Sequence, residues 1–280
     1  MKLKLHIGMP KTGTTAIQKM LAASSPPPPL TYGITGVLLF CSDGVREKDL
    51  LRRYKLQESD IDSVKKTIEA EFEELESSGV SQLLFSSEFF YDVSNYPESL
   101  EKVATFFHNY FEDIEIILYL RHPVNHFPSL VAQRVTSGQS DWKGIMRVPS
   151  VLYKFDIVCD LWSKYFRLNL IDYNRVKTHL LVDFCERTDL KLPVKNDTRS
   201  VTNKSLSMKT LEALAYMNQF LPSDKPEHRR EVIERLSILN VKDNTSPLTP
   251  ELSRHIRKKF ADNIENLEKN YLGGKTLIEL

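Results

Sequence analysis

The stretch that decides the fold is HIGMPKTGTT, residues 6–15. It closes a short apolar run, expected to be a strand over residues 2–8, and precedes a helix expected over residues 14–24. Gly8 and Gly13 can adopt positive φ, so the backbone N–H groups between them can turn toward one phosphate. The positive end of the helix dipole would lie at the same point. The stretch therefore predicts a phosphate-binding loop between a strand and a helix.

The lysine of this loop does not stand where nucleotide triphosphatases carry it. Gly8 and Gly13 have the spacing of the frame G-x-x-x-x-G, but Thr14 and Thr15 follow where Lys and Ser/Thr are usual. The lysine, Lys11, lies inside the loop instead. This displacement argues against a loop that binds ATP together with magnesium.

Composition narrows the class of protein. The 280 residues are 41% hydrophobic and 27% charged, as in ordinary soluble globular domains. A net charge of +1 gives no general attraction to nucleic acid, so no nucleic-acid partner is expected and any basic site must be local. No segment approaches the roughly 20 apolar residues of a transmembrane helix. Composition does not indicate an oligomeric state.

The three cysteines, Cys41, Cys159 and Cys185, are far apart and form no C-x-x-C pair. Neither a disulfide framework nor a metal site is expected from them, and a reducing compartment is the plain interpretation. The N-terminus also lacks the apolar segment of a signal peptide. We therefore expect a cytoplasmic protein.

Strand-like and helix-like segments alternate in the first half of the chain. Further strands are expected over residues 36–41, 80–85 and 114–120, helices over 61–77 and 97–111, and an extended connector at the prolines 26–29. Strands separated by helices of this length predict a parallel sheet. Their nearly continuous apolar character predicts that the sheet is covered on both faces.

Helical patterns dominate beyond about residue 150. They are expected over residues 151–165, 176–187, 206–220, 227–239 and 250–270, with one more strand over 169–173. Neither a repeat nor a clear linker interrupts the chain. We predict one α/β domain over residues 1–280: a three-layer P-loop-type fold whose central parallel sheet is flanked by helices and whose C-terminal part is mostly helical.

Glu88 is the candidate general base. It follows the expected strand in the run LLFSSEFF, residues 83–90. Ligands of parallel α/β sheets gather at the carboxyl ends of the strands, so this carboxylate should point toward the loop. Phe89 and Phe90 beside it should raise its pKa toward a value useful for taking a proton from a hydroxyl. The alternative is an acid that only caps a turn.

These motifs together resemble a known family. HIGMPKTGTT is similar to the 5′-phosphosulfate loop, P-K-S/T-G-T-T/S, of sulfotransferases that use 3′-phosphoadenosine 5′-phosphosulfate (PAPS). In LYLRHPVNHFPS, residues 118–129, the spacing of Arg121 and Ser129 resembles the 3′-phosphate site of that family. Weaker similarities lie in TNKSLS, residues 202–207, and in residues 260–273. The family fold is a single α/β domain around a parallel sheet.

The resemblance implies a role for each of these residues. The donor PAPS would be held by a set of loop and helix residues: Lys11, Thr12, Gly13, Thr14, Thr15, Arg121 and Ser129. Lys11 would also stabilise charge on the oxygen that bridges sulfur and phosphorus, and Glu88 would be the base, as in carbohydrate sulfotransferases. The product would be adenosine 3′,5′-bisphosphate. The acceptor would be a hydroxyl or amine of a carbohydrate, glycolipid or small molecule, and no metal is expected.

Two residues depart from the family pattern. His126 stands where many relatives have arginine, and Pro128 directly precedes Ser129. Because proline is tolerated in the first turn of a helix, this helix is expected to start with Asn125 as its N-cap.

A histidine is the alternative base. His6 is expected to pack in the core and His108 to lie on the surface, whereas His122 and His126 are expected near the 3′-phosphate.

Four polar residues can each be interpreted as functional or as structural. Asn203 and Ser205 either close over the nucleotide or cap a helix. Gln133 and Arg134 either line the acceptor cleft or belong to a solvated helix face.

Two other functions remain open at this stage. A P-loop kinase or ATPase would need an aspartate after a buried strand to hold Mg²⁺, and the superficially suitable Asp183 lies in a helical pattern. A non-catalytic nucleotide-binding protein of the same fold is the second.

The acceptor pocket is expected in residues 25–54, 91–96 and 137–149. The aromatic side chains of these segments either bind the acceptor or only pack within the fold: Tyr32, Phe40, Tyr91, Tyr96 and Trp142.

Overall fold

The computed structural model describes residues 1–23, 66, 69, 70, 72, 73, 76, 77, 79–192, 206–221, 226–238 and 246–279. The chain divides into two compact units. Unit 1 comprises Met1–Leu120, Phe155–Asn196 and Asn266–Thr276, and unit 2 comprises Arg121–Lys154, Asp197–Glu265 and Leu277–Leu280. Each unit is described by itself, and the single domain expected over residues 1–280 stays a prediction.

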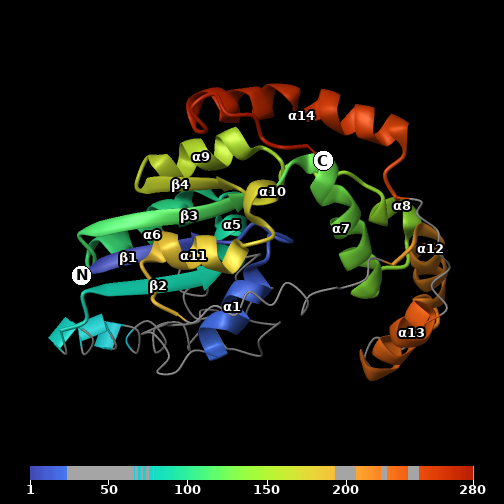
Figure 1. The fold of residues 1–280 in the computed structure, drawn as a ribbon, viewed down its shortest axis with the longest axis horizontal. Helices are drawn as coiled ribbons and strands as arrows, with labels where there is room; N and C mark the ends of the chain where they lie inside the picture. The colour runs from blue at the N-terminus through green and yellow to red at the C-terminus, as the bar shows by residue number, and fades with distance from the viewer. Residues whose placement is uncertain are drawn as a thin grey trace. The chain divides into compact units, whose positions relative to one another are not determined.

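Unit 1 is built on a four-stranded parallel sheet (Figure 1). Its strands are β1 (Lys2–Ile7), β2 (Gln82–Ser87), β3 (Asp113–Leu120) and β4 (Arg167–Asp172), in the spatial order β2-β1-β3-β4. The predicted α/β class with a central parallel sheet is confirmed. The register pairs Ile7 with Ser87, so the residues that follow β1 and β2 leave the sheet side by side.

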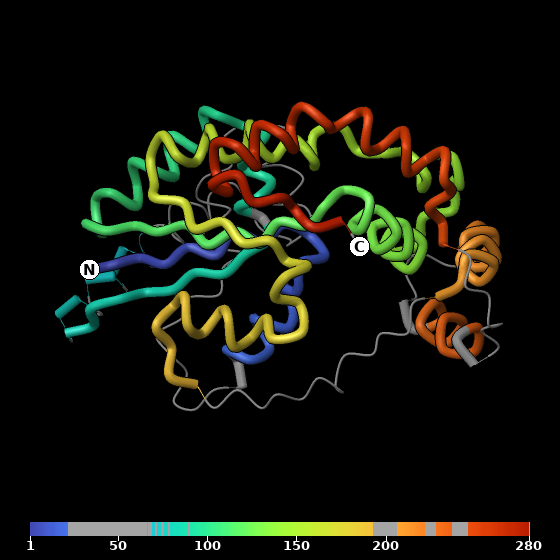
Figure 2. The backbone as a smooth tube through the Cα atoms, turned by 45° about the horizontal axis from the view of Figure 1, so that its top comes forward, coloured from blue at the N-terminus to red at the C-terminus, as the bar shows by residue number. Residues whose placement is uncertain are grey.

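Helices cover both faces of this sheet (Figure 2). On one face lie α1 (Thr14–Ala23), α10 (Tyr173–Val176) and α11 (Leu180–Thr188), which bury Ile17 and Phe184 against Tyr119. On the other lie α6 (Pro97–His108) and α9 (Phe155–Ser163). The helix α5 (Phe89–Val93) directly follows β2 and Glu88. The sheet is buried on both faces, which explains the continuous apolar run in β3.

Unit 2 is helical. It holds α7 (Pro123–Thr136), α8 (Trp142–Ile145), α12 (Met208–Met217), α13 (Pro226–Ile238) and the first sixteen residues of α14 (Pro250–Asn270), whose last five belong to unit 1. The mostly helical C-terminal part is therefore confirmed for the described residues. Two expected helices are shorter or divided: residues 151–154 precede α9, and residues 177–179 separate α10 from α11.

The predicted start of α7 is wrong. The N-cap is His122 rather than Asn125, and the imidazole Nδ1 accepts a hydrogen bond of 3.3 Å from the backbone N–H of Val124. Pro123 occupies the first helical position, where its fixed φ and missing N–H favour the helix. Pro128 consequently lies inside the helix, beyond the first turn in which it was expected.

Several predicted features lie outside the described residues. These are the proline connector at 26–29, the strand over 36–41, Cys41, the pocket segment 25–54 with Tyr32 and Phe40, and the side chains of Asn203 and Ser205. Of the helix expected over residues 61–77, the described positions are helical. Within the described part of the chain, no helix is long and apolar enough to cross a membrane.

Candidate functional site

The predicted loop joins the end of β1 to the start of α1. The backbone N–H of Gly8 donates to the Ser87 carbonyl at 3.0 Å, which fixes the start of the loop against β2. Inside the loop, the Thr12 hydroxyl donates to the Met9 carbonyl at 2.7 Å. The single hydroxyl proton of Thr12 is therefore used to shape the loop, and Thr12 itself is fully buried. Beyond it, the first N–H groups of α1 lack partners within the helix, as at any helix N-terminus.

Glycine is required at position 13. Gly13 has a φ of +85°, and a Cβ atom there would lie 2.3 Å from Leu180 Cδ2. The loop thus packs its backbone directly on α11. Lys11 also has a positive φ, +63°, which a side chain rarely adopts, and it is exposed. Such backbone strain is typical of functional sites.

Glu88 lies against this loop, as the sequence predicts. A Cβ atom at Gly8 would lie 2.4 Å from Thr14 Oγ1 and 3.2 Å from Glu88 Cγ. The absence of a side chain at Gly8 therefore lets the threonine and the carboxylate approach the same backbone. Glu88 is half-buried and makes no side-chain cap hydrogen bond to α5, so it is not the turn-capping acid of the alternative interpretation.

The surroundings of Glu88 raise its pKa. Desolvation by burial is the largest cause, and the negative charge of Asp92 acts in the same direction. The neighbouring Thr14 hydroxyl and the Lys11 ammonium oppose the shift. Lys11 and Thr14 are thus close enough to the carboxylate to stabilise its ionised form. Asp92 was missed in the sequence, although its position four residues after Glu88 is the signal that could have found it.

Thr14 Oγ1 is a buried polar atom with no hydrogen-bond partner of normal geometry among the described residues. Its side chain stands at the N-terminus of α1, with Glu88 near it. A buried hydroxyl without a partner costs free energy unless a ligand or water satisfies it. This observation and the helix N-terminus both fit an anion held by the loop. Thr15 is exposed on the same turn.

His6 is the predicted core histidine. It is fully buried, its Nδ1 lies 2.8 Å from Ser86 Oγ, and its ring packs edge-on against Tyr119 and Phe184. Desolvation lowers its pKa to about 3, so the imidazole is neutral at ordinary pH. His108 is exposed and its Nε2 lies 3.1 Å from the Tyr165 carbonyl.

In unit 2 the structure brings Arg121 and Ser129 together. Arg121 Nη1 donates to Ser129 Oγ at 3.3 Å, and the same hydroxyl donates to the His126 carbonyl at 2.7 Å. Both side chains are half-buried. The start of α7 therefore brings together two residues that lie eight positions apart in the sequence, with the guanidinium beside the hydroxyl.

The two other histidines in this region have partners within the fold. His126 is fully buried, and its Nδ1 lies 2.8 Å from the Tyr153 hydroxyl. His122 caps α7 and its Nε2 lies 3.7 Å from a carboxylate oxygen of Glu279. Tyr153 and Glu279 were not found from the sequence, because nothing local links them to residues 27 and 157 positions earlier.

The structure describes several of the residues named for the acceptor cleft, whose role there stays a prediction. Arg134 Nη1 donates to the carbonyls of Ile145 and Arg147, which fastens the segment around α8 to α7. Gln133 is exposed. Tyr91 is buried in the core of unit 1, whereas Trp142 is half-exposed at the start of α8.

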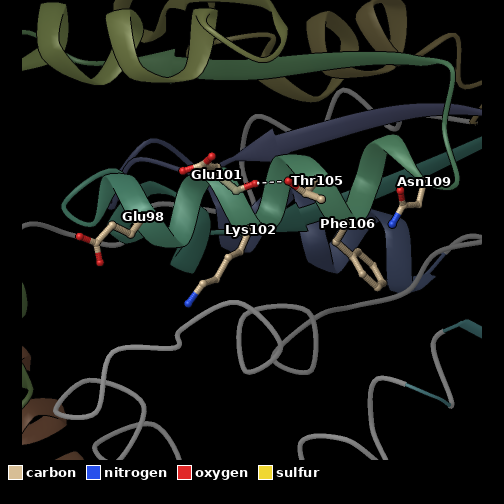
Figure 3. Close-up of a pocket in the computed structure, with 6 residues that line it drawn as sticks. All are labelled: Glu98, Glu101, Lys102, Thr105, Phe106 and Asn109. Carbon is tan, nitrogen blue, oxygen red and sulfur yellow. Dashed lines mark hydrogen bonds between the residues drawn. The ribbon is translucent and has the colours of Figure 1, made fainter.

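A separate hollow of about 540 Å³ lies along α6. Figure 3 shows the side chains that line it, all from α6 and its C-cap: Glu98, Glu101, Lys102, Thr105, Phe106 and Asn109. None of them belongs to the loop or was predicted as a site residue. Among the described residues, no group of three or more His, Cys, Asp or Glu side chains is arranged to hold a metal ion, and Cys159 and Cys185 are free and buried.

Comparisons with known proteins give a match in structure alone. No family model matches the chain, and no curated protein does. The crystal structure of a sulfotransferase from Alicyclobacillus acidocaldarius is similar over 95% of this chain and 94% of its own, with 13% identity and a TM-score of 0.48. The sulfotransferase domain from the curacin biosynthetic pathway is similar over 92% and 96%, with 15% identity and a TM-score of 0.42. At these identities neither assigns a role to a residue of this chain.

Proposed function

We propose that this chain is a sulfotransferase that moves a sulfuryl group from PAPS to a hydroxyl or amine of a carbohydrate, glycolipid or small-molecule acceptor. The observation that carries the proposal is the carboxylate of Glu88 beside the phosphate-binding loop. The loop motif itself resembles the 5′-phosphosulfate loop of PAPS-dependent enzymes, and Lys11 stands at the position that this resemblance requires. The cytoplasmic location and the chemical class of the acceptor stay predictions.

The loop has the features that a 5′-phosphosulfate needs. Gly8 leaves room at the backbone, Thr14 Oγ1 is buried and without a normal partner, and α1 presents its N-terminus. Lys11, Gly13, Thr14 and Thr15 would hold the 5′-phosphosulfate, and Thr12 would support the loop through Met9. On the resemblance of the sequence, Arg121 and Ser129 of unit 2 would hold the 3′-phosphate through the planar guanidinium fork and the hydroxyl.

The donor supplies a sulfuryl group whose bond to the bridging oxygen breaks as the acceptor oxygen or nitrogen bonds to sulfur. Glu88 takes the proton of the acceptor, and its raised pKa makes it a better base than an exposed carboxylate. Lys11 stabilises the negative charge that develops on the bridging oxygen as the bisphosphate leaves with the electron pair. Because Glu88 must be ionised to act, the turnover rate should rise as the pH passes through its raised pKa.

The decisive experiment is a binding comparison by calorimetry. A PAPS-dependent enzyme binds adenosine 3′,5′-bisphosphate more tightly than AMP or ATP, with or without Mg²⁺. Arg121→Ala should weaken the bisphosphate by roughly tenfold or more, as expected for a charge-assisted hydrogen bond, and leave AMP unchanged. Arg254→Ala, at an exposed position in the same unit, is the control. Equal binding of AMP and the bisphosphate, or a preference for ATP that requires Mg²⁺, would refute the proposal.

Turnover tests the base. Glu88→Gln should slow transfer by about 10²–10⁴-fold, the usual contribution of a general base. Incubating cell extract with labelled PAPS and identifying the labelled product by mass spectrometry would name the acceptor. A Glu88→Gln variant that transfers sulfate at the normal rate would leave a histidine or solvent as the base.

A further inference from the structure

Glu88 places a negative charge where the loop receives its anion. Its Cγ and the Thr14 hydroxyl both occupy the space that a side chain at Gly8 would take, and Lys11 is close enough to act on the carboxylate electrostatically. An anion that takes the Thr14 hydroxyl and the α1 N-terminus would therefore lie within a few ångströms of Glu88. The carboxylate is half-buried, so water screens this interaction less than at an exposed site.

The terminal groups of candidate donors differ in charge. A terminal sulfuryl group carries one negative charge, whereas a terminal phosphoryl group carries nearly two above its second pKa of about 6. Lys11 attracts both groups, but the carboxylate repels the phosphoryl group more strongly. Asp92 adds a second negative charge that acts on Glu88, and Lys11 is the cation among the groups that shift the pKa of Glu88.

We propose that Glu88, lodged against Gly8 and Thr14, is the residue by which the loop selects a singly charged sulfuryl group over a doubly charged phosphoryl group. This inference rests on the proposed function, because it assigns a second task to the same carboxylate. It requires no change in the loop on binding. The discrimination comes from like-charge repulsion at a fixed, partly desolvated position.

The test compares two ligands that differ at one atom. PAPS and adenosine 3′-phosphate 5′-diphosphate have the same 3′-phosphate and ribose but end in sulfuryl and phosphoryl. Their dissociation constants would be measured calorimetrically at pH 8, without acceptor and with chelator to remove divalent ions. The wild-type protein should bind PAPS at least about tenfold more tightly. Glu88→Gln should reduce this ratio to about twofold or less, mainly by tightening the diphosphate.

Matched variants separate the possible outcomes. Glu98→Gln, an exposed acid on α6, should keep the wild-type ratio, and Asp92→Asn should lower it less than Glu88→Gln does. Glu88→Ala is the second variant at the site, since Glu88 makes no cap hydrogen bond that folding needs. An unchanged ratio in both Glu88 variants, or equal affinities in the wild-type protein, would overturn the inference. Failure to bind adenosine 3′,5′-bisphosphate at all would instead refute the proposed function.

Discussion

The sharpest structural prediction concerns Gly13→Ala. At a φ of +85°, an alanine pays roughly 1–2 kcal/mol of backbone strain. Its Cβ would also lie 2.3 Å from Leu180 Cδ2, where carbon atoms normally stand about 3.5–4.0 Å apart. Leu180 is 7% exposed and packs in the core beneath the loop, so the displaced side chain should cost a further 1–3 kcal/mol or so, as overpacking does. The total loss of stability should be about 2–5 kcal/mol.

Gly79→Ala is the matched control for backbone strain. Gly79 has a φ of +81°, almost the value at Gly13, but a Cβ there would meet nothing within 4 Å. Its loss should therefore be the strain alone, about 1–2 kcal/mol. Both variants would be unfolded with urea, and the two transitions compared with that of the wild-type protein. If Gly13→Ala is no less stable than Gly79→Ala, the close packing of the loop on α11 is refuted.

Three further predictions test buried polar groups within the two units. Because the pKa of His6 is lowered to about 3 in the folded state, the protein should lose stability as the pH falls from about 6.5 toward 3. His6→Leu should reduce the dependence of the unfolding free energy on pH by up to about 1.4 kcal/mol per pH unit in urea unfolding, whereas His255→Gln at an exposed position should not. Asp183→Asn should lower the free energy of unfolding by about 2 kcal/mol in a thermal melt, since Asp183 accepts from the Tyr119 hydroxyl and from both Nε and Nη2 of Arg187. As a control, Glu231→Gln, in the exposed helix pair with Arg235, should change stability by less than about 0.5 kcal/mol. Asn218→Ala should cost about 1–2 kcal/mol, because Asn218 Nδ2 donates to the carbonyls of Val135 and Gln139 at the end of α7, and an unchanged unfolding midpoint would contradict this capping role.

The loop and its neighbours were predictable because their determinants are local. A strand, two glycines and a helix specify β1, the loop and α1 within one residue of their observed ends. Glu88 could be placed beside the loop because adjacent parallel strands end at the same edge, and the register of β1 with β2 confirms it. These predictions needed the periodicity of the chain and the general rule for the carboxyl ends of parallel strands.

Predictions failed or stayed incomplete where a distant partner decides the structure. Asn125 was expected to cap α7, but Pro123 and the His122 imidazole begin the helix earlier. The place of His126 near the 3′-phosphate stays a prediction, but the contact of its ring with Tyr153 belongs to no local pattern. Arg134 likewise fastens two carbonyls of a later segment. Such contacts depend on how the chain folds back on itself, which spacing along the sequence does not encode.

The unusual position of Lys11 in the loop is explained best together with the nearby carboxylate of Glu88. In a loop that binds a nucleoside triphosphate, a cation and a metal face the phosphates. Here Lys11 lies near a carboxylate, that of Glu88. Burial raises the pKa of Glu88, and the charge of Lys11 lowers it. In the proposed function, this carboxylate would repel a doubly charged terminal group and would also act as the base toward the acceptor. Because both proposed roles fall on Glu88, Glu88→Gln should alter the choice of donor and the removal of the acceptor proton at once.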